Sequence, residues 1–356
     1  MNTSIRKILC LVLALACVFA LAACGQKTTS TEPEGSAAAP SEAGAVYTVG
    51  IVKFVDHPSL NQIVDNIQKQ LDALSAELGV TFDYSVYDGQ ADATTLNQIG
   101  AELVDQGVDI IVPVATPAAQ VMKSVTEGTD IPVVFAAVSD PVSAGLVDSM
   151  DAPGDAITGT SDSLNTQAIL DLMFAADPEL DYVGLLYSKS EDASAQPIAD
   201  AIAYLEAKNV RYIEKTGTST DEIMSAADAL VAEGVGAVFT PTDNTVQSAE
   251  LAIYEKFLDA NIPHYGGADS FALNGAFAGY GVDYAVLGAA TADMVADILV
   301  NGADPASMAV QTFDNGIATI NTDTCAAIGF DLDTIREAFK DLCTQLVETT
   351  TAEEFE

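Results

Sequence analysis

Residues 109–137 read DIIVPVATPAAQVMKSVTEGTDIPVVFAA, and this stretch is the clearest guide to the fold. Two short apolar runs, Asp109–Val114 and Ile131–Ala137, enclose a segment with helical spacing, Pro117–Thr126. A threonine before the proline is a typical helix start, because a hydroxyl caps free amides and proline fixes φ for the first turn. A buried strand, a helix and a second buried strand in succession predict a parallel βαβ unit.

The same alternation continues along most of the chain. Further strands are expected at 47–54, 80–87, 182–187, 210–215, 235–239, 262–265 and 276–280, and near 157–161 and 309–320. Helices are expected at 60–78, 96–107, 193–207, 219–232, 245–259, 284–300 and 334–346. Two series of βα units predict an α/β protein with two doubly wound parallel-sheet lobes. Since no Gly/Pro-rich linker separates the series, the chain should cross between lobes through the strand near 157–161.

The composition is strongly acidic. Lys plus Arg total 13 against 52 Asp plus Glu, a net charge of −39 over 356 residues. Nucleic-acid binding needs a basic face that displaces counterions from phosphates, so this class of function is excluded. The same field would repel an anionic membrane surface or a polyphosphate. An apolar content of 49% indicates a globular protein, and the length suggests about two domains.

The N-terminus has the pattern of an export signal. Arg6-Lys7 precedes an apolar run at 8–23, which is shorter than the roughly 20 residues of a membrane-spanning helix. The sequence Leu21-Ala22-Ala23-Cys24-Gly25 resembles the bacterial lipobox, in which cleavage precedes the cysteine and its sulfur receives a lipid; an ordinary secretory signal is the alternative. Residues 24–45 lack aromatic and large aliphatic side chains, which predicts a flexible tether. We therefore expect a signal peptide at 1–23, lipidation at Cys24 and an extracytoplasmic body anchored to the cell membrane.

Motifs for catalysis and metal binding are scarce. The chain has no GxSxG, GxxxxGK, GxGxxG, HExxH or CxxC pattern. The two histidines exclude a multi-histidine metal site; His264 ends an apolar strand and is expected to be structural, whereas His57 could meet a ligand or lie in a solvated turn. Cys325 and Cys343 could form a disulfide or remain buried thiols. No enzyme, metal or cofactor is predicted; the alternative is an exported hydrolase that uses a carboxylate pair.

Polar residues gather where the predicted strands end. These loops are 55–58, 115–119, 138–141, 160–162, 188–190, 241–244 and 266–270. Because ligands of open α/β sheets bind outside the carboxyl ends of the strands, the loops predict a binding cleft. Thr116, with the amides of Ala118 and Ala119, could hold a carboxylate at the positive end of its helix, and Asp269 could receive an ammonium group. Each such residue could also be a cap or turn residue.

Six segments, taken in order, resemble one family. They are VGIVKFVDHPSL (49–60), ATPAAQ (115–120), IPVVFAAVSDPVSAGLV (131–147), GTSD (159–162), PTDNTV (241–246) and GYGVDY (279–284). The family is that of the ABC-transporter substrate-binding lipoproteins of the tryptophan/tyrosine-binding type, which have the type I periplasmic-binding-protein fold. The resemblance runs from about 47 to 347. It implies three crossovers between lobe 1 (46–158 plus 283–302) and lobe 2 (159–282 plus 303–348), with an acidic tail at 349–356.

The resemblance also implies a cleft site for an α-amino acid, aromatic or branched. The hydroxyls of Thr116, Ser139 and Ser161 would serve the carboxylate. Asp162, Asn244 and Asp269 would serve the amino group. Phe54 and Tyr187 would lie nearest the side-chain pocket, although the chain has no tryptophan to stack with a ligand. The full set of candidate residues is Phe54, His57, Thr116, Ser139, Asp140, Ser161, Asp162, Tyr187, Asp243, Asn244 and Asp269.

The function that the resemblance implies is a monomeric receptor that closes on its ligand and delivers it to an ABC permease. A sensor ectodomain of the same fold is an alternative, weakened because the chain ends in TTTAEEFE without a second apolar span. A repressor of the same fold is excluded by the export signal and by the lack of a basic helix-turn-helix.

Overall fold

The structure is a computed structural model that describes residues 44–313 and 316–355, all within one compact unit, Ala39–Glu356. The predicted signal peptide at 1–23, the predicted lipidation site Cys24 and most of the predicted tether at 24–45 lie outside the described residues. Among the described residues, no helix is long and apolar enough to span a membrane.

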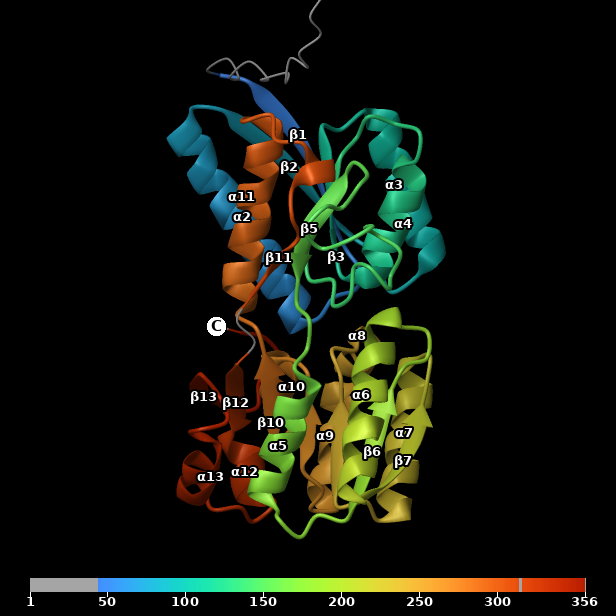
Figure 1. Ribbon diagram of the computed structural model, residues 1–356, viewed down its shortest axis with the longest axis vertical. Helices are drawn as coiled ribbons and strands as arrows, with labels where there is room; N and C mark the ends of the chain where they lie inside the picture. Colours follow the sequence, from blue (N-terminus) through green and yellow to red (C-terminus); the bar gives the residue numbers. More distant parts are fainter. Residues whose placement is uncertain (1–43, 314–315, 356) are drawn as a thin grey trace, which may run out of the picture. The chain divides into compact units, whose positions relative to one another are not determined.

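The first sheet contains the βαβ unit that residues 109–137 predict. Its parallel strands run in the order β11-β5-β4-β3-β1-β2. They are β1 (Val46–Lys53), β2 (Thr81–Asp88), β3 (Ile110–Val114), β4 (Val133–Phe135), β5 (Ile157–Ser161) and β11 (Gln311–Thr312). Helices α2 (Pro58–Leu78) and α11 (Tyr284–Leu299) cover one face, and α3 (Ala93–Gln106) and α4 (Thr116–Thr126) cover the other (Figure 1). The succession β3, α4, β4 confirms the predicted unit.

The second sheet has the order β13-β12-β10-β9-β8-β6-β7, and every neighbouring pair is parallel except β10 with β12. Its strands are β6 (Tyr182–Tyr187), β7 (Arg211–Thr216), β8 (Ala237–Thr240), β9 (His264–Gly266), β10 (Ala278–Gly281), β12 (Ile317–Asn321) and β13 (Gln345–Thr349). One face is covered by α5 (Thr166–Ala176), α6 (Asp192–Lys208) and α13 (Leu332–Phe339), and the other by α7 (Thr220–Glu233) and α9 (Glu250–Asp259). Shorter helices are α8 (Asn244–Gln247), α10 (Asp269–Leu273), α12 (Thr322–Ala327) and the 3-10 helix η2 (Pro305–Ser307).

The chain passes between the two sheets three times. It leaves the first sheet after β5, returns after β10 through α11, and leaves again between β11 and β12. Two parallel α/β lobes with three connections confirm the predicted fold class. Both β5 and β11 lie in the first sheet, where Gln311 pairs with Thr160.

Helix α2 shows how the sequence determines a local element. Ile63, Ile67 and Leu71 recur every four residues, and all three are fully buried against the first sheet. The helix ends at Gly79, whose φ of 68° is the left-handed conformation that glycine adopts at least cost. This was the predicted end of the helix.

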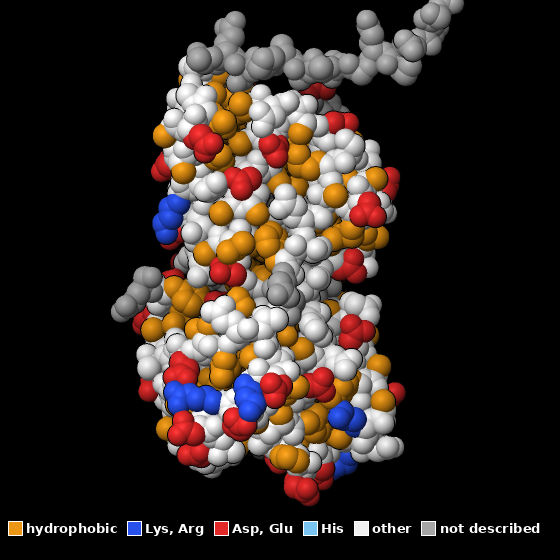
Figure 2. All heavy atoms as spheres, turned by 60° about the vertical axis from the view of Figure 1, so that its left-hand side comes forward, with side chains coloured by type: hydrophobic (Ala, Val, Ile, Leu, Met, Phe, Trp, Pro, Cys, Tyr) orange, Lys and Arg blue, Asp and Glu red, His pale blue; other side chains and the backbone are white. Residues whose placement is uncertain are grey.

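The acidic excess lies mainly at the surface. On the face shown in Figure 2, Asp and Glu side chains are widely spread, and Lys and Arg are few. The buried acids of the described chain are Asp162, Glu191, Asp243 and Glu250. These four lie in or next to the site described below or in the core behind it.

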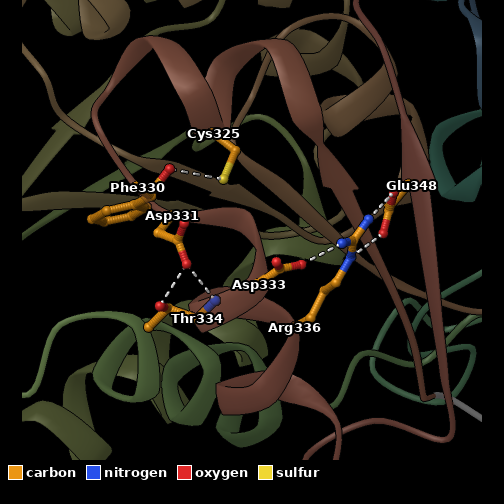
Figure 3. Close-up of polar contacts among 7 residues, drawn as sticks. All are labelled: Cys325, Phe330, Asp331, Asp333, Thr334, Arg336 and Glu348. Carbon is orange, nitrogen blue, oxygen red and sulfur yellow. Dashed lines mark hydrogen bonds and ion pairs between the residues drawn. The ribbon is translucent and has the colours of Figure 1, made fainter.

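The predicted closing helix at 334–346 is wrong in its second half, because α13 ends at Phe339 and residues 345–349 form β13. Leu342 and Leu346 continue the helical spacing but pack against the second sheet from a turn and a strand. Arg336 on α13 holds β13 in place through two bonds to Glu348, of 2.6 and 2.8 Å (Figure 3).

The two thiols of the body are not bridged. Cys325 is buried, with its Sγ 3.8 Å from the carbonyl oxygen of Phe330 (Figure 3), and Cys343 is half-buried. Both are free, so the alternative of a disulfide between them is not realised.

Candidate ligand-binding site

A pocket lies between the two sheets, where the strand-end loops of both lobes meet. From the first lobe it is lined by His57, Ser59, Leu60, Ala115, Thr116, Ala137, Ser139, Asp162 and Tyr284. From the second lobe it is lined by Ala193, Thr242, Asp243, Asn244, Gln247, Ala268, Ser270 and Phe271. The position agrees with the rule that open α/β sheets bind ligands beyond the carboxyl ends of their strands.

The start of α4 presents a hydroxyl to this pocket. The Oγ1 atom of Thr116 is buried and has no hydrogen-bond partner. The preceding residue, Ala115, has φ 82° and ψ 155°, and Ala137 after β4 has φ 53°, which are conformations that L residues rarely adopt. The amide of Ala119 donates to the Ala115 carbonyl at 3.1 Å, so the expectation that it would be free for a ligand is wrong.

Asp162 is the centre of a cluster of hydrogen-bonded side chains on the first-lobe side of the pocket. Its Oδ1 accepts from the Ser139 hydroxyl at 2.9 Å, and its Oδ2 accepts from the Tyr284 hydroxyl at 3.2 Å. Burial raises the pKa of Asp162 above its usual range, against the lowering effect of these two bonds. Because the Ser139 proton is already donated, this hydroxyl offers only lone pairs to a ligand.

His57 connects the two lobes. Its Nε2 lies 3.0 Å from Oδ1 of Asn244, and the Asn244 amide nitrogen donates to Glu191 Oε2 at 2.7 Å. The asparagine oxygen must therefore accept, which places the proton of His57 on Nε2 and leaves Nδ1 as a buried acceptor without a partner. Burial lowers the pKa of His57 to about 4, so the ring is neutral at pH 7. His57 is 7% exposed, and the alternative of a solvated turn is wrong.

Asp243 and Glu191 hold the opposite wall in place. Asp243 accepts from the Ser188 amide and the Ser194 hydroxyl, both at 2.7 Å, and caps α8 through the Val246 amide at 3.0 Å. Burial raises the pKa of both carboxyls, and repulsion from Asp243 adds to the effect on Glu191. With its oxygens taken by the protein, Asp243 serves the architecture of the wall.

Asp269 begins α10, between the pocket-lining residues Ala268 and Ser270. Its Oδ1 is buried without a partner. Burial raises the pKa of Asp269 to about 7, and the negative charge of Asp283 contributes to the rise. An unpaired carboxyl of this kind would gain from a cationic partner.

His264 lies behind the pocket wall, as expected of a structural histidine. Its Nδ1 is 3.0 Å from Glu250 Oε1 and its Nε2 is 2.8 Å from the Thr240 hydroxyl. The ring packs edge-on against Phe271, with 5.8 Å between ring centroids. His264 is 2% exposed, so it supports the wall and does not reach the pocket.

Several predicted residues lie elsewhere. Phe54 lines a separate hollow that contains Gln90 and Pro117. Tyr187 is in the second-lobe core, and its hydroxyl donates to Glu214 at 2.6 Å. Asp140 caps the Ser143 amide and lies with Ser161 in a neighbouring hollow. Of the candidates, the pocket itself brings together His57, Thr116, Ser139, Asp162, Asp243 and Asn244.

Several further lining residues were not among the candidates, among them Ser59, Leu60, Gln247, Ser270, Phe271 and Tyr284. The sequence does point to two of them: Tyr284 closes the segment GYGVDY, and Ser270 ends the predicted cleft loop at 266–270. Ser59, Leu60 and Gln247 lie within the first or last turn of a helix, where helical spacing alone does not say which lobe they will face.

The charge of the pocket restricts its ligands. Its lining contains Asp162 and Asp243, with Asp269 adjacent, and none of the described lining residues is Lys or Arg. Among the described residues, no cluster of His, Cys, Asp and Glu could hold a metal ion. The arrangement therefore suits a small ligand with a positive group and disfavours an anion.

Comparisons with known proteins agree on one family. The family described as ABC transporter substrate binding protein matches residues 48–335. A tyrosine-binding protein of Clostridioides difficile (strain R20291) is 30% identical over 325 residues, which are 91% of this chain and 92% of that protein.

Solved structures are similar as well. An ABC domain from Streptococcus pneumonia in complex with L-Trp is 31% identical, with a TM-score of 0.77 over 85% of this chain and 100% of that one. A conserved domain protein from Vibrio cholerae is 30% identical, with a TM-score of 0.75 over 84% and 99%. The ligand-free, open structure of a substrate-binding protein with adhesive properties from Clostridium difficile is 27% identical, with a TM-score of 0.63 over 86% and 100%.

Proposed function

The chain belongs to the family of ABC transporter substrate-binding proteins, and from this membership we propose that it captures an aromatic or branched amino acid by closure of its two lobes. The ligand would then pass to an ABC permease. An N-terminal lipid on Cys24 would keep the protein, as a monomer, at the outer face of the cell membrane.

The observation that carries the ligand class is a pair of unsatisfied polar atoms. The buried Thr116 Oγ1 can donate to a carboxylate, and the buried Asp269 Oδ1 can accept from an ammonium group. Leaving buried polar atoms without partners costs free energy, which a ligand recovers by supplying them. A zwitterionic α-amino group carries both partners, and no Lys or Arg of the described lining is available to bind a purely anionic ligand.

The rest of the pocket supports an apolar ligand side chain. Leu60, Phe271, Ala115 and Ala137 provide apolar contact surface, and Tyr284 adds an aromatic ring. Phe271 could pack against an aromatic ligand, since aromatic pairs gain from edge or offset contacts. The neutral His57, with Nδ1 unpaired, would accept a hydrogen bond from a polar group of the ligand. A tyrosine-binding relative and an L-Trp complex among the similar structures favour the same class.

A thermal-shift screen tests this proposal. Protein from residue 25 onward would be partly unfolded and refolded to remove co-purified ligand, then screened against the twenty amino acids, nucleosides, simple sugars and short peptides. At 100 times the dissociation constant, a true ligand should add about 2.7 kcal/mol to the free energy of unfolding. We expect this shift with Trp, Tyr, Phe or a branched amino acid.

Variants identify the site that causes the shift. Asp269→Ala and Thr116→Ala should lose it, whereas Asp65→Ala, at an exposed position of α2, should keep it. If a sugar or nucleoside raises the melting temperature and no amino acid does, the family assignment stands and the proposed ligand is wrong.

A further inference from the structure

Helix α10 is a short element that faces the pocket on one side and the C-terminal segment on the other. Ser270 and Phe271 line the pocket, and the Leu273 carbonyl at the other end of α10 accepts from the Ala352 amide at 2.8 Å. Five residues have few hydrogen bonds of their own. The position of α10 therefore depends on what holds its two ends.

A continuous chain of buried hydrogen bonds runs from the pocket to the C-terminal segment. Ser59 on α2 donates to the Ser270 hydroxyl at 2.6 Å, which donates to Gln247 Oε1 at 2.9 Å. Gln247 Nε2 donates to Asn274 Oδ1 at 2.8 Å. Asn274 Nδ2 donates to the Ala352 carbonyl at 2.8 Å and to that of Glu353 at 3.2 Å. The four side chains are at most 4% exposed, and the first link crosses from one lobe to the other.

The C-terminal segment is itself firmly attached to the second lobe. It follows β13, which pairs with β12 along five residues and is fixed to α13 through Arg336 and Glu348 (Figure 3). The Thr351 hydroxyl accepts from the Asn321 amide nitrogen at 2.9 Å. Farther along, Glu354 Oε1 accepts from Asn61 on α2, in the first lobe, at 3.3 Å.

We propose that residues 350–355 brace the pocket through Asn274, so that Asn274 and this segment set ligand affinity although neither lines the pocket. This inference rests on the proposed binding function. Asn274 is a positioning residue: it orients Gln247, which orients Ser270, and Ser270 meets Ser59 across the two lobes. Every donor in the chain has an acceptor because the carbonyls of Ala352 and Glu353 complete it.

The test is a double-mutant cycle on the protein from residue 25 onward. One change is truncation after Thr349; the other is Asn274→Asp, which keeps the acceptor for Gln247 but removes the donors to the segment. Each change should weaken binding of L-tryptophan or L-tyrosine by about ten-fold, mainly through faster dissociation. Because both break the same link, the double variant should be no weaker than the truncation. Additive losses, or an unchanged dissociation constant in either single variant, would overturn the inference.

Two controls separate a positioning role from a general loss of stability. Asn301→Asp makes the same chemical change at an exposed site in the turn after α11 and should leave affinity unchanged. Ala352→Pro keeps the segment but removes the amide that bonds to the Leu273 carbonyl, so it should also weaken binding. This variant replaces the truncation in the test if the truncated chain does not fold. A variant that only lowers the melting temperature while the folded protein keeps its affinity contradicts the proposal.

A ligand-free measurement keeps this test independent of the ligand assignment. Hydrogen exchange of the amides in 268–274 should speed up in the truncated protein and in Ala352→Pro, because α10 loses its brace. Unchanged exchange there would overturn the inference even if the amino-acid screen succeeds. Faster exchange in a protein that binds no amino acid would support the brace and refute only the proposed ligand.

Discussion

Asp269 is the residue through which pH should control ligand binding. Its pKa is raised from 3.8 to about 7, chiefly by burial, and an ammonium partner would lower the pKa again. Binding therefore requires proton loss below pH 7, and affinity should fall as the acid becomes protonated. From pH 8 to pH 5.5 we expect a loss of about 30-fold, the reciprocal of the ionised fraction at the lower pH.

Calorimetric titrations across this range measure the effect. Asp269→Asn should bind more weakly at pH 8 and show little change down to pH 5.5. The stability of the ligand-free protein changes with pH in the opposite direction to the affinity. The contribution of Asp269 to stability is fully present below pH 3.8 and is lost as pH rises through about 7. A wild-type affinity that stays constant over the range would show that Asp269 does not contact the ligand.

At the level of single residues, the sequence located the site through loop position. Thr116, His57, Asp162 and Asn244 all follow strands, and they were found because parallel strands bring their carboxyl ends together. Tyr187 is also at a strand end, but its side chain points into the core, where its hydroxyl donates to Glu214. Which side of the sheet a strand-end side chain takes depends on the packing of the second lobe, and local sequence does not specify that packing.

Helix α4 begins with backbone strain, and this strain should be measurable. Ala115 has φ 82° and ψ 155°, a region that is almost restricted to glycine. Relief of the strain in Ala115→Gly should exceed the entropy cost of glycine and stabilise the empty protein by about 1 kcal/mol. The matched variant Ala118→Gly, inside the same helix and fully buried, should cost about 1 kcal/mol. Urea unfolding of both variants measures this, and a destabilised Ala115→Gly would refute the prediction.

Elements with a strong hydrophobic periodicity could be predicted from the sequence. Elements that depend on tertiary contacts with other parts of the lobe could not. Residues 109–137 form a strand, a helix and a strand because apolar runs and a Thr-Pro start agree with one another. Leu346 continues the helical spacing of α13, yet it lies in β13 because β12 offers a parallel edge and Arg336 offers an ion pair to Glu348. Both partners are brought there by the rest of the second lobe, so tertiary context overrides the local pattern.

Across the whole molecule, affinity should depend on contacts that join the two lobes. One of these lies outside the pocket: Gln120 Nε2 on α4 donates to Asp192 Oδ2 on α6 at 2.8 Å. Since neither residue lines the pocket, a change here acts on the ligand only through the balance of open and closed forms. The two residues therefore allow closure to be altered without touching the ligand.

Charge at position 120 should move affinity in both directions. Gln120→Glu places a second carboxylate opposite Asp192 and should weaken binding by about three-fold, whereas Gln120→Lys should strengthen it by about three-fold, as expected of an exposed charge pair. Both effects should shrink between about 50 mM and about 500 mM salt, because exposed charges are screened. Adding Asp192→Asn to Gln120→Glu should restore wild-type affinity, and dissociation rates should carry most of each change. If Gln120→Glu and Gln120→Lys shift the dissociation constant in the same direction, the contact between Gln120 and Asp192 does not control closure of the lobes.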